Sequence, residues 1–188
     1  MVPADLSSFI HGLADRAEAA DWLMTVAAQD LLYVAVPVLL ALWFRPAALR
    51  AGLAAVLGAL LALGLAAALG GIHAEARPFV ADHYAPVFPH DADASFPSDH
   101  LAVLGAVAAG AWLGSRRLGY LIASLSLIVA FARVFAGVHY VDDVVVGFAV
   151  GVASGAIVWF ALSPVVPLLT SLDSVLQSRH LRPPPPQA

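Results

Sequence analysis

The chain alternates between long apolar runs and short polar segments. We interpret five runs as membrane spans: residues 31–44, 52–72, 101–114, 118–136 and 144–162, the first of which extends back to Thr25 on one interpretation. A helix that crosses a bilayer needs roughly 20 mostly apolar residues. The pattern predicts an all-α integral membrane helical bundle of about five transmembrane helices.

The segment before the first span has helical spacing of its apolar and polar side chains. Leu6, Phe9, Ile10, Leu13 and Ala17 fall on one side, and Asp5, Ser8, Asp15 and Glu18 fall largely on the other. This spacing predicts an amphipathic helix over residues 5–29 that lies on the membrane surface. Two roles stay open for it: packing over the entrance for lipid, or a solvated leader without function.

The chain ends in a different kind of sequence. Residues 164–176 predict an interfacial or partly inserted helix, and Arg182 is followed by four prolines, which favour a polyproline or disordered end. We therefore expect a single membrane domain over residues 1–176 and a Pro-rich cytoplasmic tail over residues 177–188.

Composition narrows the function classes. Of the 188 residues, 61% are hydrophobic and only 12% are charged, which excludes an ordinary soluble domain. The net charge of -4 argues against nucleic acid as a partner, and the absence of cysteine excludes disulfides and thiolate metal sites. The first twenty residues have no basic region followed by an apolar core, so we expect no cleaved signal peptide.

Basic residues in the short loops predict the orientation. They lie between the first two spans, between the third and fourth, and after the fifth: Arg45, Arg50, Arg116, Arg117, Arg179 and Arg182. Cytoplasmic loops carry the excess of Lys and Arg, so these regions should be cytoplasmic. The opposite, extracytoplasmic end carries a second polar set, consisting of Arg77, His100, Arg133, His139 and Asp143.

The stretch Phe96-Pro97-Ser98-Asp99-His100 marks a helix start that could hold an anion. Ser98 is a favoured N-cap, and the first N–H groups of a helix have no partner within it and carry partial positive charge. A phosphate suits such a site. The alternative is an ordinary capped membrane helix.

Two further clusters favour a phosphate site over an ordinary capped helix. Arg77-Pro78 lies upstream, and Arg133 lies downstream with His139 and Asp143. Ionisable residues near membrane depth are costly, so their gathering at segment ends needs a common reason. A structural histidine on a capped helix is the alternative for the last two.

These residue types suit phosphoryl transfer. Asp143 follows His139 by four positions, so the carboxylate can fix one ring nitrogen and leave the other free to attack, with Asp142 as a competing carboxylate. Arg77 and Arg133 would present donor forks to phosphate oxygens. Ser98 and the backbone N–H groups of Asp99 and His100 would complete the cradle, with the His100 side chain as general acid. This arrangement requires neither metal nor cofactor.

The three clusters resemble, in order and spacing, the signature motifs of the type 2 phosphatidic acid phosphatase (PAP2) superfamily. Residues 94–100 are also similar to the small bacterial undecaprenyl diphosphate phosphatases of the BcrC type. The resemblance implies a PAP2-like bundle, a phosphohistidine on His139, Asp143 as its orienting group and His100 as proton donor. It also implies that Arg77, Ser98 and Arg133 bind phosphate without a metal.

The chain departs from the family pattern at three positions. Gly70 stands where the first motif has a lysine, and His73 is the nearest basic residue. Ala132 stands where the third motif has serine, and Asp99 where the second has glycine. We hypothesise that Asp99 orients His100 or adapts the site to a diphosphate.

The leading hypothesis is a lipid phosphatase in a bacterial cell membrane that converts undecaprenyl or another polyprenyl diphosphate to the monophosphate and so recycles the carrier for cell-wall synthesis. One alternative is a phosphatidate or phosphatidylglycerophosphate phosphatase. Another is a catalytically inactive lipid-binding or translocating protein. A metal site on the long loop is a third, but its residues are irregularly spaced and favour a polar surface loop: His83, His90, Asp91 and Asp93. Oligomeric state is left open.

Overall fold

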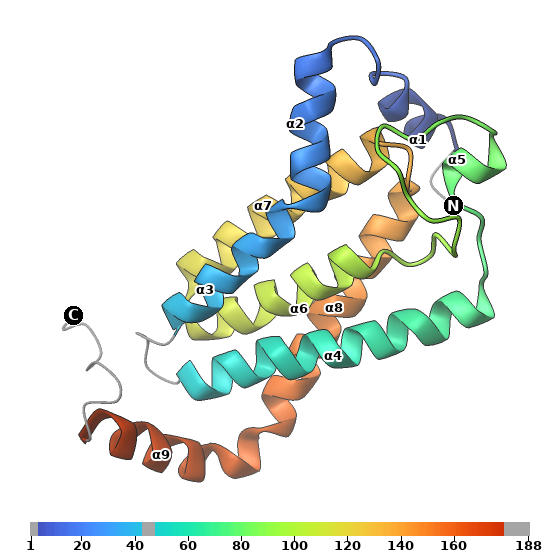
Figure 1. The fold of residues 1–188 in the computed structure, drawn as a ribbon. Helices are drawn as coiled ribbons and strands as arrows, with labels where there is room; N and C mark the ends of the chain where they lie inside the picture. The colour runs from blue at the N-terminus through green and yellow to red at the C-terminus, as the bar shows by residue number, and fades with distance from the viewer. Residues whose placement is uncertain (1–3, 43–47, 179–188) are drawn as a thin grey trace.

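The computed structural model describes residues 4–42 and 48–178, most of which are helical (Figure 1). The elements in chain order are α1 (Ala4–His11), α2 (Glu18–Gln29), the 3-10 helix η1 (Leu31–Val34), α3 (Ala35–Leu42), α4 (Ala48–Ile72), α5 (Pro78–Ala81), α6 (Asp99–Gly114), α7 (Arg116–Phe135), α8 (Val141–Ala161), the 3-10 helix η2 (Ser163–Val165) and α9 (Val166–Ser178). The predicted all-helical membrane bundle is confirmed.

The expected spans can be compared with the length and composition of each helix. In the described part of the chain, α4, α7 and α8 are each long and apolar enough to cross a bilayer. A fourth span results if α2 is joined to the segment 31–42, which bends from it by 50°. Helix α6 is apolar but has only 16 residues.

The bend explains why the apolar run 31–44 is short for a membrane span. Pro37 cannot donate a backbone hydrogen bond, and its ring clashes with the carbonyl four residues earlier in a continuous α-helix. The chain accordingly passes through η1 and restarts as α3 at Ala35. The predicted end of that span at Phe44 lies outside the described residues.

The amphipathic segment 5–29 forms two helices, not one. A turn separates α1 from α2, and Asp15 in it has a φ of 60°. Helix α1 packs on α7 and on the start of α8: the Val141 backbone N–H donates to the Ser7 hydroxyl at 3.1 Å, and His11 Nδ1 lies 2.9 Å from the Phe135 carbonyl. Helix α1 is therefore a packed element, which argues against a solvated leader.

Helix α6 forms the centre of the bundle and packs against α4, α7 and α8. The contact with α8 depends on small residues, because a Cβ at Gly151 would overlap the Ala102 carbonyl oxygen and a Cβ at Gly147 would overlap that of Ser98. Small residues allow such close backbone approach between membrane helices. The start of α6 is thereby fixed against the start of α8.

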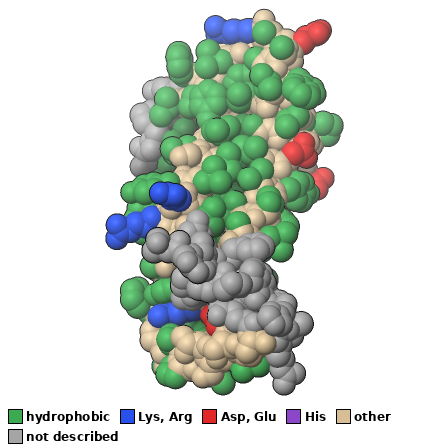
Figure 2. All heavy atoms as spheres, turned by 90° about the vertical axis from the view of Figure 1, so that its left-hand side faces the viewer, with side chains coloured by type: hydrophobic (Ala, Val, Ile, Leu, Met, Phe, Trp, Pro, Cys, Tyr) green, Lys and Arg blue, Asp and Glu red, His purple; other side chains and the backbone are tan. Residues whose placement is uncertain are grey.

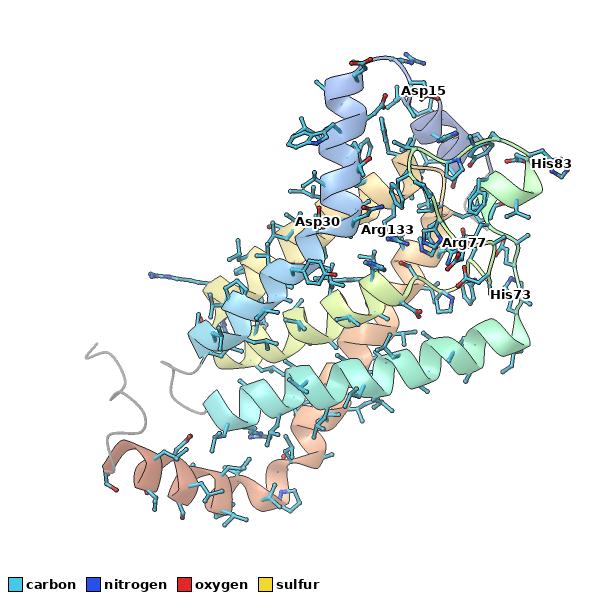
Figure 3. All side chains as sticks on the ribbon, viewed as in Figure 1. Asp15, Asp30, His73, Arg77, His83 and Arg133 are labelled. Atoms are coloured by element: carbon cyan, nitrogen blue, oxygen red, sulfur yellow. The ribbon has the colours of Figure 1, made fainter. Side chains whose placement is uncertain are left out.

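Two arginine sets lie at opposite ends of the bundle. Arg50, Arg116 and Arg117 lie where α4 and α7 begin, and Figure 3 places Arg77 and Arg133 together at the other end. The Arg50 guanidinium donates to the Trp159 carbonyl at 2.7 Å and so satisfies a carbonyl in the last turn of α8. Arg45, Arg179 and Arg182 fall outside the described residues.

Hydrophobic side chains cover most of the face shown in Figure 2, with few charged groups between them. Helix α9 continues this character, since Leu168, Leu172 and Val175 are exposed at helical spacing. Its last residue is Ser178, so the helix passes the predicted start of the tail at 177, and residues 179–188 are not described. The protein is a multi-pass membrane protein.

Candidate active site

The three sequence clusters meet at one end of the bundle, where the loop before α6 folds over the ends of α7 and α8. The backbones of Ala76 and Ala94 form an isolated antiparallel bridge that closes the loop. The Ser98 N–H donates to the Asp143 carbonyl at 3.1 Å and joins the loop to α8. Gly137, with a φ of 75°, allows the turn between α7 and α8.

His139 and Asp143 form a buried hydrogen-bonded pair. The His139 Nδ1 atom lies 3.2 Å from Asp143 Oδ2, and the same oxygen accepts from the Tyr140 backbone N–H at 2.7 Å. A carboxylate on Nδ1 holds the proton there and leaves Nε2 with a free lone pair. Asp142, the competing carboxylate, is only partly buried and makes no recorded contact with His139.

Burial also keeps His139 in its neutral form. Burial is the largest influence and lowers the pKa of the imidazole, and the charges of Arg133 and Arg77 act in the same direction. The hydrogen bond to Asp143 opposes this shift. A neutral imidazole is the form that can act as a nucleophile.

Two arginines flank the free nitrogen of His139. Arg77 NH1 and Arg133 NH2 each lie 3.2 Å from His139 Nε2. A guanidinium has no acceptor, so both distances require the lone pair of Nε2 to accept. The free nitrogen and two guanidinium groups thus face one point.

Each guanidinium is held by further contacts. Arg77 NH1 donates to the Val138 carbonyl at 2.9 Å, and Arg133 NH1 donates at 3.2 Å to the Ala28 carbonyl, which lies in the last turn of α2. Arg133 therefore binds the carbonyl end of α2 beside the bend at Asp30 (Figure 3). Its Nε atom is buried and has no hydrogen-bond partner among the described residues.

The start of α6 lies beside this point. Ser98 occupies the predicted N-cap position, but its side chain makes no capping bond, and its hydroxyl is buried without a partner in the described part of the chain. His100 is half-buried, and this burial lowers the pKa of its imidazole, with the charges of Arg133 and Arg77 acting in the same direction. Asp99 is exposed and no hydrogen bond to His100 is recorded for it, so the hypothesis that it orients His100 has no contact to support it.

Residues 51–165 match the family model described as the PAP2 superfamily. The chain belongs to this superfamily.

Individual proteins agree with this assignment. The undecaprenyl-diphosphatase BcrC of Bacillus subtilis (strain 168) is 31% identical over 152 residues, which cover 78% of this chain and 77% of that protein. The crystal structure of Aquifex aeolicus LpxE superimposes with a TM-score of 0.70 at 24% identity, covering 84% of this chain and 94% of that chain.

A second solved structure, the PAP2 type phosphatidylglycerolphosphate phosphatase from Bacillus subtilis, gives a TM-score of 0.61 at 23% identity and covers 82% of this chain and 83% of that chain. Both structures share the fold. The protein is a PAP2 membrane phosphatase.

Gly70, which stands where the PAP2 pattern has a lysine, lies close to the backbone of the loop before α6. An ideal Cβ at position 70 would lie 2.8 Å from the Phe96 carbonyl oxygen. His73, considered as a substitute, packs edge-on against the Phe96 ring, and its Nε2 lies 3.6 Å from Glu75 Oε2. No contact of His73 with Arg77, Arg133 or His139 is recorded. Ala132 is fully buried in the core beneath the site.

Three residues near the site were not assigned to it in the sequence analysis. Ser95 is fully buried and its hydroxyl donates to Asp143 Oδ2. Asp93 Oδ1 lies 2.8 Å from Arg77 Nε, and this guanidinium holds the pKa of the Asp93 carboxyl below its usual range. His90 Nε2 lies 3.0 Å from Arg133 NH2.

The long loop is more than a polar surface, because His90 is half-buried and Asp93, although exposed, contacts Arg77. The bridge between Ala76 and Ala94 turns this part of the loop toward the arginines, which spacing along the chain does not reveal. His83 and Asp91 are exposed, as expected. Within residues 4–42 and 48–178, no group of three or more His, Cys, Asp or Glu side chains is arranged to hold a metal ion.

An apolar cavity of about 470 Å³ opens beside the site between α6, α7 and α8. Leu101 and Val144 line it, and these residues directly follow His100 and Asp143 in the chain. The rest of its lining runs along the bundle and is mostly apolar: Tyr120, Ala123, Ser124, Ser126, Leu127, Ala130, Val145 and Phe148. Its position and lining suit an apolar chain.

Proposed function

We propose that the protein removes the terminal phosphate of undecaprenyl diphosphate, or of a close polyprenyl relative, through a phosphohistidine on His139. The observation that supports this proposal most directly is the position of His139. Its free Nε2 lies between Arg77 and Arg133, and its Nδ1 is hydrogen-bonded to Asp143. A nucleophile, its orienting group and two anion-binding groups suit phosphoryl transfer.

In the proposed reaction, His139 Nε2 attacks the terminal phosphorus. A nitrogen–phosphorus bond forms, and the bond from phosphorus to the bridging oxygen breaks. His100, in the imidazolium form that the bound diphosphate stabilises, gives a proton to the departing lipid monophosphate and becomes neutral, and Asp143 stabilises the positive charge on His139. Water, deprotonated by His100, then attacks the phosphohistidine, so that inorganic phosphate leaves and both histidines return to their starting forms.

Arg77 and Arg133 neutralise charge on the phosphoryl oxygens during both steps, and the unpartnered Ser98 hydroxyl is available to donate to one of them. The roles assigned to these residues use no metal and no cofactor.

The choice of a polyprenyl diphosphate draws on two observations. The name of the Bacillus subtilis relative supports the diphosphate headgroup. The apolar cavity beside His100 supports a long apolar tail. The arginines at the far end of the bundle support a site on the extracytoplasmic face of a bacterial cell membrane, because basic residues favour the cytoplasm.

The test is phosphate release by purified protein in detergent with EDTA. We expect wild-type protein to release phosphate from undecaprenyl diphosphate and His139→Ala to release none above background. His83→Asn is the matched control, because His83 is an exposed loop histidine with a φ of 56°, which asparagine tolerates. This variant should keep wild-type activity.

Three results would count against the proposal. Faster turnover of phosphatidate or phosphatidylglycerophosphate than of undecaprenyl diphosphate would assign that lipid as the substrate instead. Loss of release with EDTA would contradict the metal-free mechanism. Release from no lipid phosphate would favour a lipid-binding or translocating protein.

A further inference from the structure

His90 reaches the candidate site from the loop between α5 and α6. Its Nε2 lies 3.0 Å from Arg133 NH2, and the same Arg133 nitrogen lies 3.2 Å from His139 Nε2. The rings of Phe79 and Phe88 lie beside the imidazole at centroid distances of 6.5 and 6.2 Å. His90 is therefore half-buried in a fixed position.

The contacts define the protonation of His90. A guanidinium nitrogen cannot accept, so His90 Nε2 faces Arg133 with a lone pair. The other nitrogen, Nδ1, lies 3.1 Å from the Asp91 carbonyl and so carries the proton. Burial lowers the pKa of His90. In the absence of an anion, two neutral histidines share one arginine donor.

A bound phosphate changes this arrangement. Negative oxygens between the arginines would replace the histidine lone pairs as acceptors. A proton on Nε2 would then turn His90 into a donor toward the anion. The charged and titratable groups that act on His90 from the surrounding elements are Arg77, Arg133, Asp93, His139 and His100.

Geometry places His90 beside the candidate phosphate position. The ring centroids of His90 and His139 are 6.5 Å apart, and both Nε2 atoms lie within 3.2 Å of the same Arg133 nitrogen. An anion that Arg133 holds at His139 would therefore also lie next to His90. In a diphosphate, the second phosphate is bonded to the group that His139 attacks, so it would lie within reach of the same side chain.

The negative charge of a bound diphosphate also favours another positively charged group at the site. Asp93 lies 2.8 Å from Arg77 and offsets part of its charge. Helix α4 contributes no basic side chain at Gly70, where a Cβ would meet the Phe96 carbonyl oxygen. A diphosphate brings more negative charge than a monophosphate, so it needs more than the two arginines.

We propose that His90 binds the leaving phosphate of a lipid diphosphate and thereby makes the enzyme prefer diphosphates over monophosphates. This inference rests on the proposed phosphatase function. In a lipid monophosphate, the atom beyond the transferred group is an ester oxygen on an apolar chain, which gives His90 no charged acceptor.

The experiment compares farnesyl diphosphate with farnesyl monophosphate, because the two share one tail and differ in the headgroup. For His90→Ala, kcat/KM on the diphosphate should fall by about 10- to 100-fold, the loss typical of one hydrogen bond to a charged group. On the monophosphate it should fall by less than about threefold. His83→Asn should change neither.

Kinetics measured over a range of pH distinguish a phosphate-binding role of His90 from a purely structural one. In wild-type protein, the preference for the diphosphate should decline as pH rises and His90 loses its proton. His90→Lys keeps a cation at this position, so it should retain the preference to higher pH, since lysine titrates near pH 10.4. A purely structural His90 would give neither behaviour.

Three results would overturn the inference. Equal losses on both substrates in His90→Ala and His90→Lys would assign His90 a structural role. Unchanged kinetics in His90→Ala would remove it from the site. A wild-type protein inactive on both substrates and on undecaprenyl diphosphate would refute the proposed function itself, whereas the first two results leave that function standing.

Discussion

The hydroxyl of Ser95 donates a hydrogen bond to the same oxygen of Asp143 that faces His139. Ser95 thus contacts the orienting carboxylate from the loop, whereas Asp143 comes from α8. The Ser95 Oγ atom also lies 3.4 Å from His139 Nδ1. We predict that Ser95 positions the pair.

Removing this hydroxyl should weaken catalysis without abolishing it. In Ser95→Ala, Asp143 keeps the Tyr140 N–H and His139 but loses one donor, so we expect kcat to fall about 10-fold, as for one hydrogen bond to a charged group, with KM changed less. Steady-state kinetics check this. Ser154→Ala is the control, because Ser154 is equally buried in α8 and lies outside the site. A wild-type kcat in Ser95→Ala would contradict the positioning role.

Substitution by asparagine should affect catalysis differently at Asp142 and at Asp143. Asp143→Asn removes the charge that holds the proton on His139 Nδ1, so kcat should fall by roughly 10²- to 10⁴-fold, as when the carboxylate partner of an active-site histidine is lost. Asp142→Asn should stay within about threefold of wild type, since Asp142 has no recorded contact with the pair. The reverse ranking would assign the orienting role to Asp142.

Glycine positions 70 and 71 should respond in opposite ways to alanine. A Cβ at Gly70 would lie 2.8 Å from the Phe96 carbonyl oxygen, whereas a Cβ at Gly71 meets nothing within 4 Å. Gly70→Ala should therefore lower the melting temperature. Gly71→Ala should leave it unchanged or raise it, because alanine favours helices by about 0.5 to 1 kcal/mol over glycine. Equal effects in detergent melting curves would show that the close approach is absent.

Restoring the family lysine should not improve this enzyme. In Gly70→Lys, the Cβ meets the same carbonyl oxygen, so the loop that carries Ser95 and Ser98 must shift. We expect a lower melting temperature and lower kcat/KM than wild type. Higher activity in this variant would show that the loop adapts and that the lysine was simply missing.

Stability should fall on acidification because of His139. In the unfolded chain, histidine has a pKa near 6.5, whereas burial lowers the pKa of His139 in the native state. Below about pH 6.5 the unfolded state therefore binds a proton that the native state does not, and the free energy of unfolding decreases. Melting temperatures between pH 7.5 and 5 should fall less in His139→Asn. Parallel curves would contradict a buried, neutral His139.

Sequence reasoning predicted much of the fold because composition restricts a chain of this kind to membrane helices. It also selected residues that the structure brings together, since Arg77, Arg133, His139 and Asp143 form one contact cluster. Their catalytic roles stay predictions that the kinetic tests address.

Other features could not be predicted from the sequence, because they depend on residues that are distant along the chain. The bend of 50° after α2 lies beside the hydrogen bond from Arg133 to the Ala28 carbonyl, and these two residues are distant in sequence. Ser95, His90 and Asp93 acquire their contacts only when the loop folds back through the bridge at Ala76. The close contact at Gly70 likewise depends on a backbone oxygen 26 positions away.

The length of α6 sets the depth of the phosphate site. Near its start, Ala102 packs with Ala62 and Ala66 of α4, and α4 continues to Ile72 (Figure 1). From Ala66 to Ile72, α4 rises about 9 Å at 1.5 Å per residue, whereas α6 covers only about 3 Å between Ala102 and His100, so His100 lies below the tip of α4. Under the proposed function, this recess would let the phosphate of a lipid meet His139 while its tail stays in the bilayer.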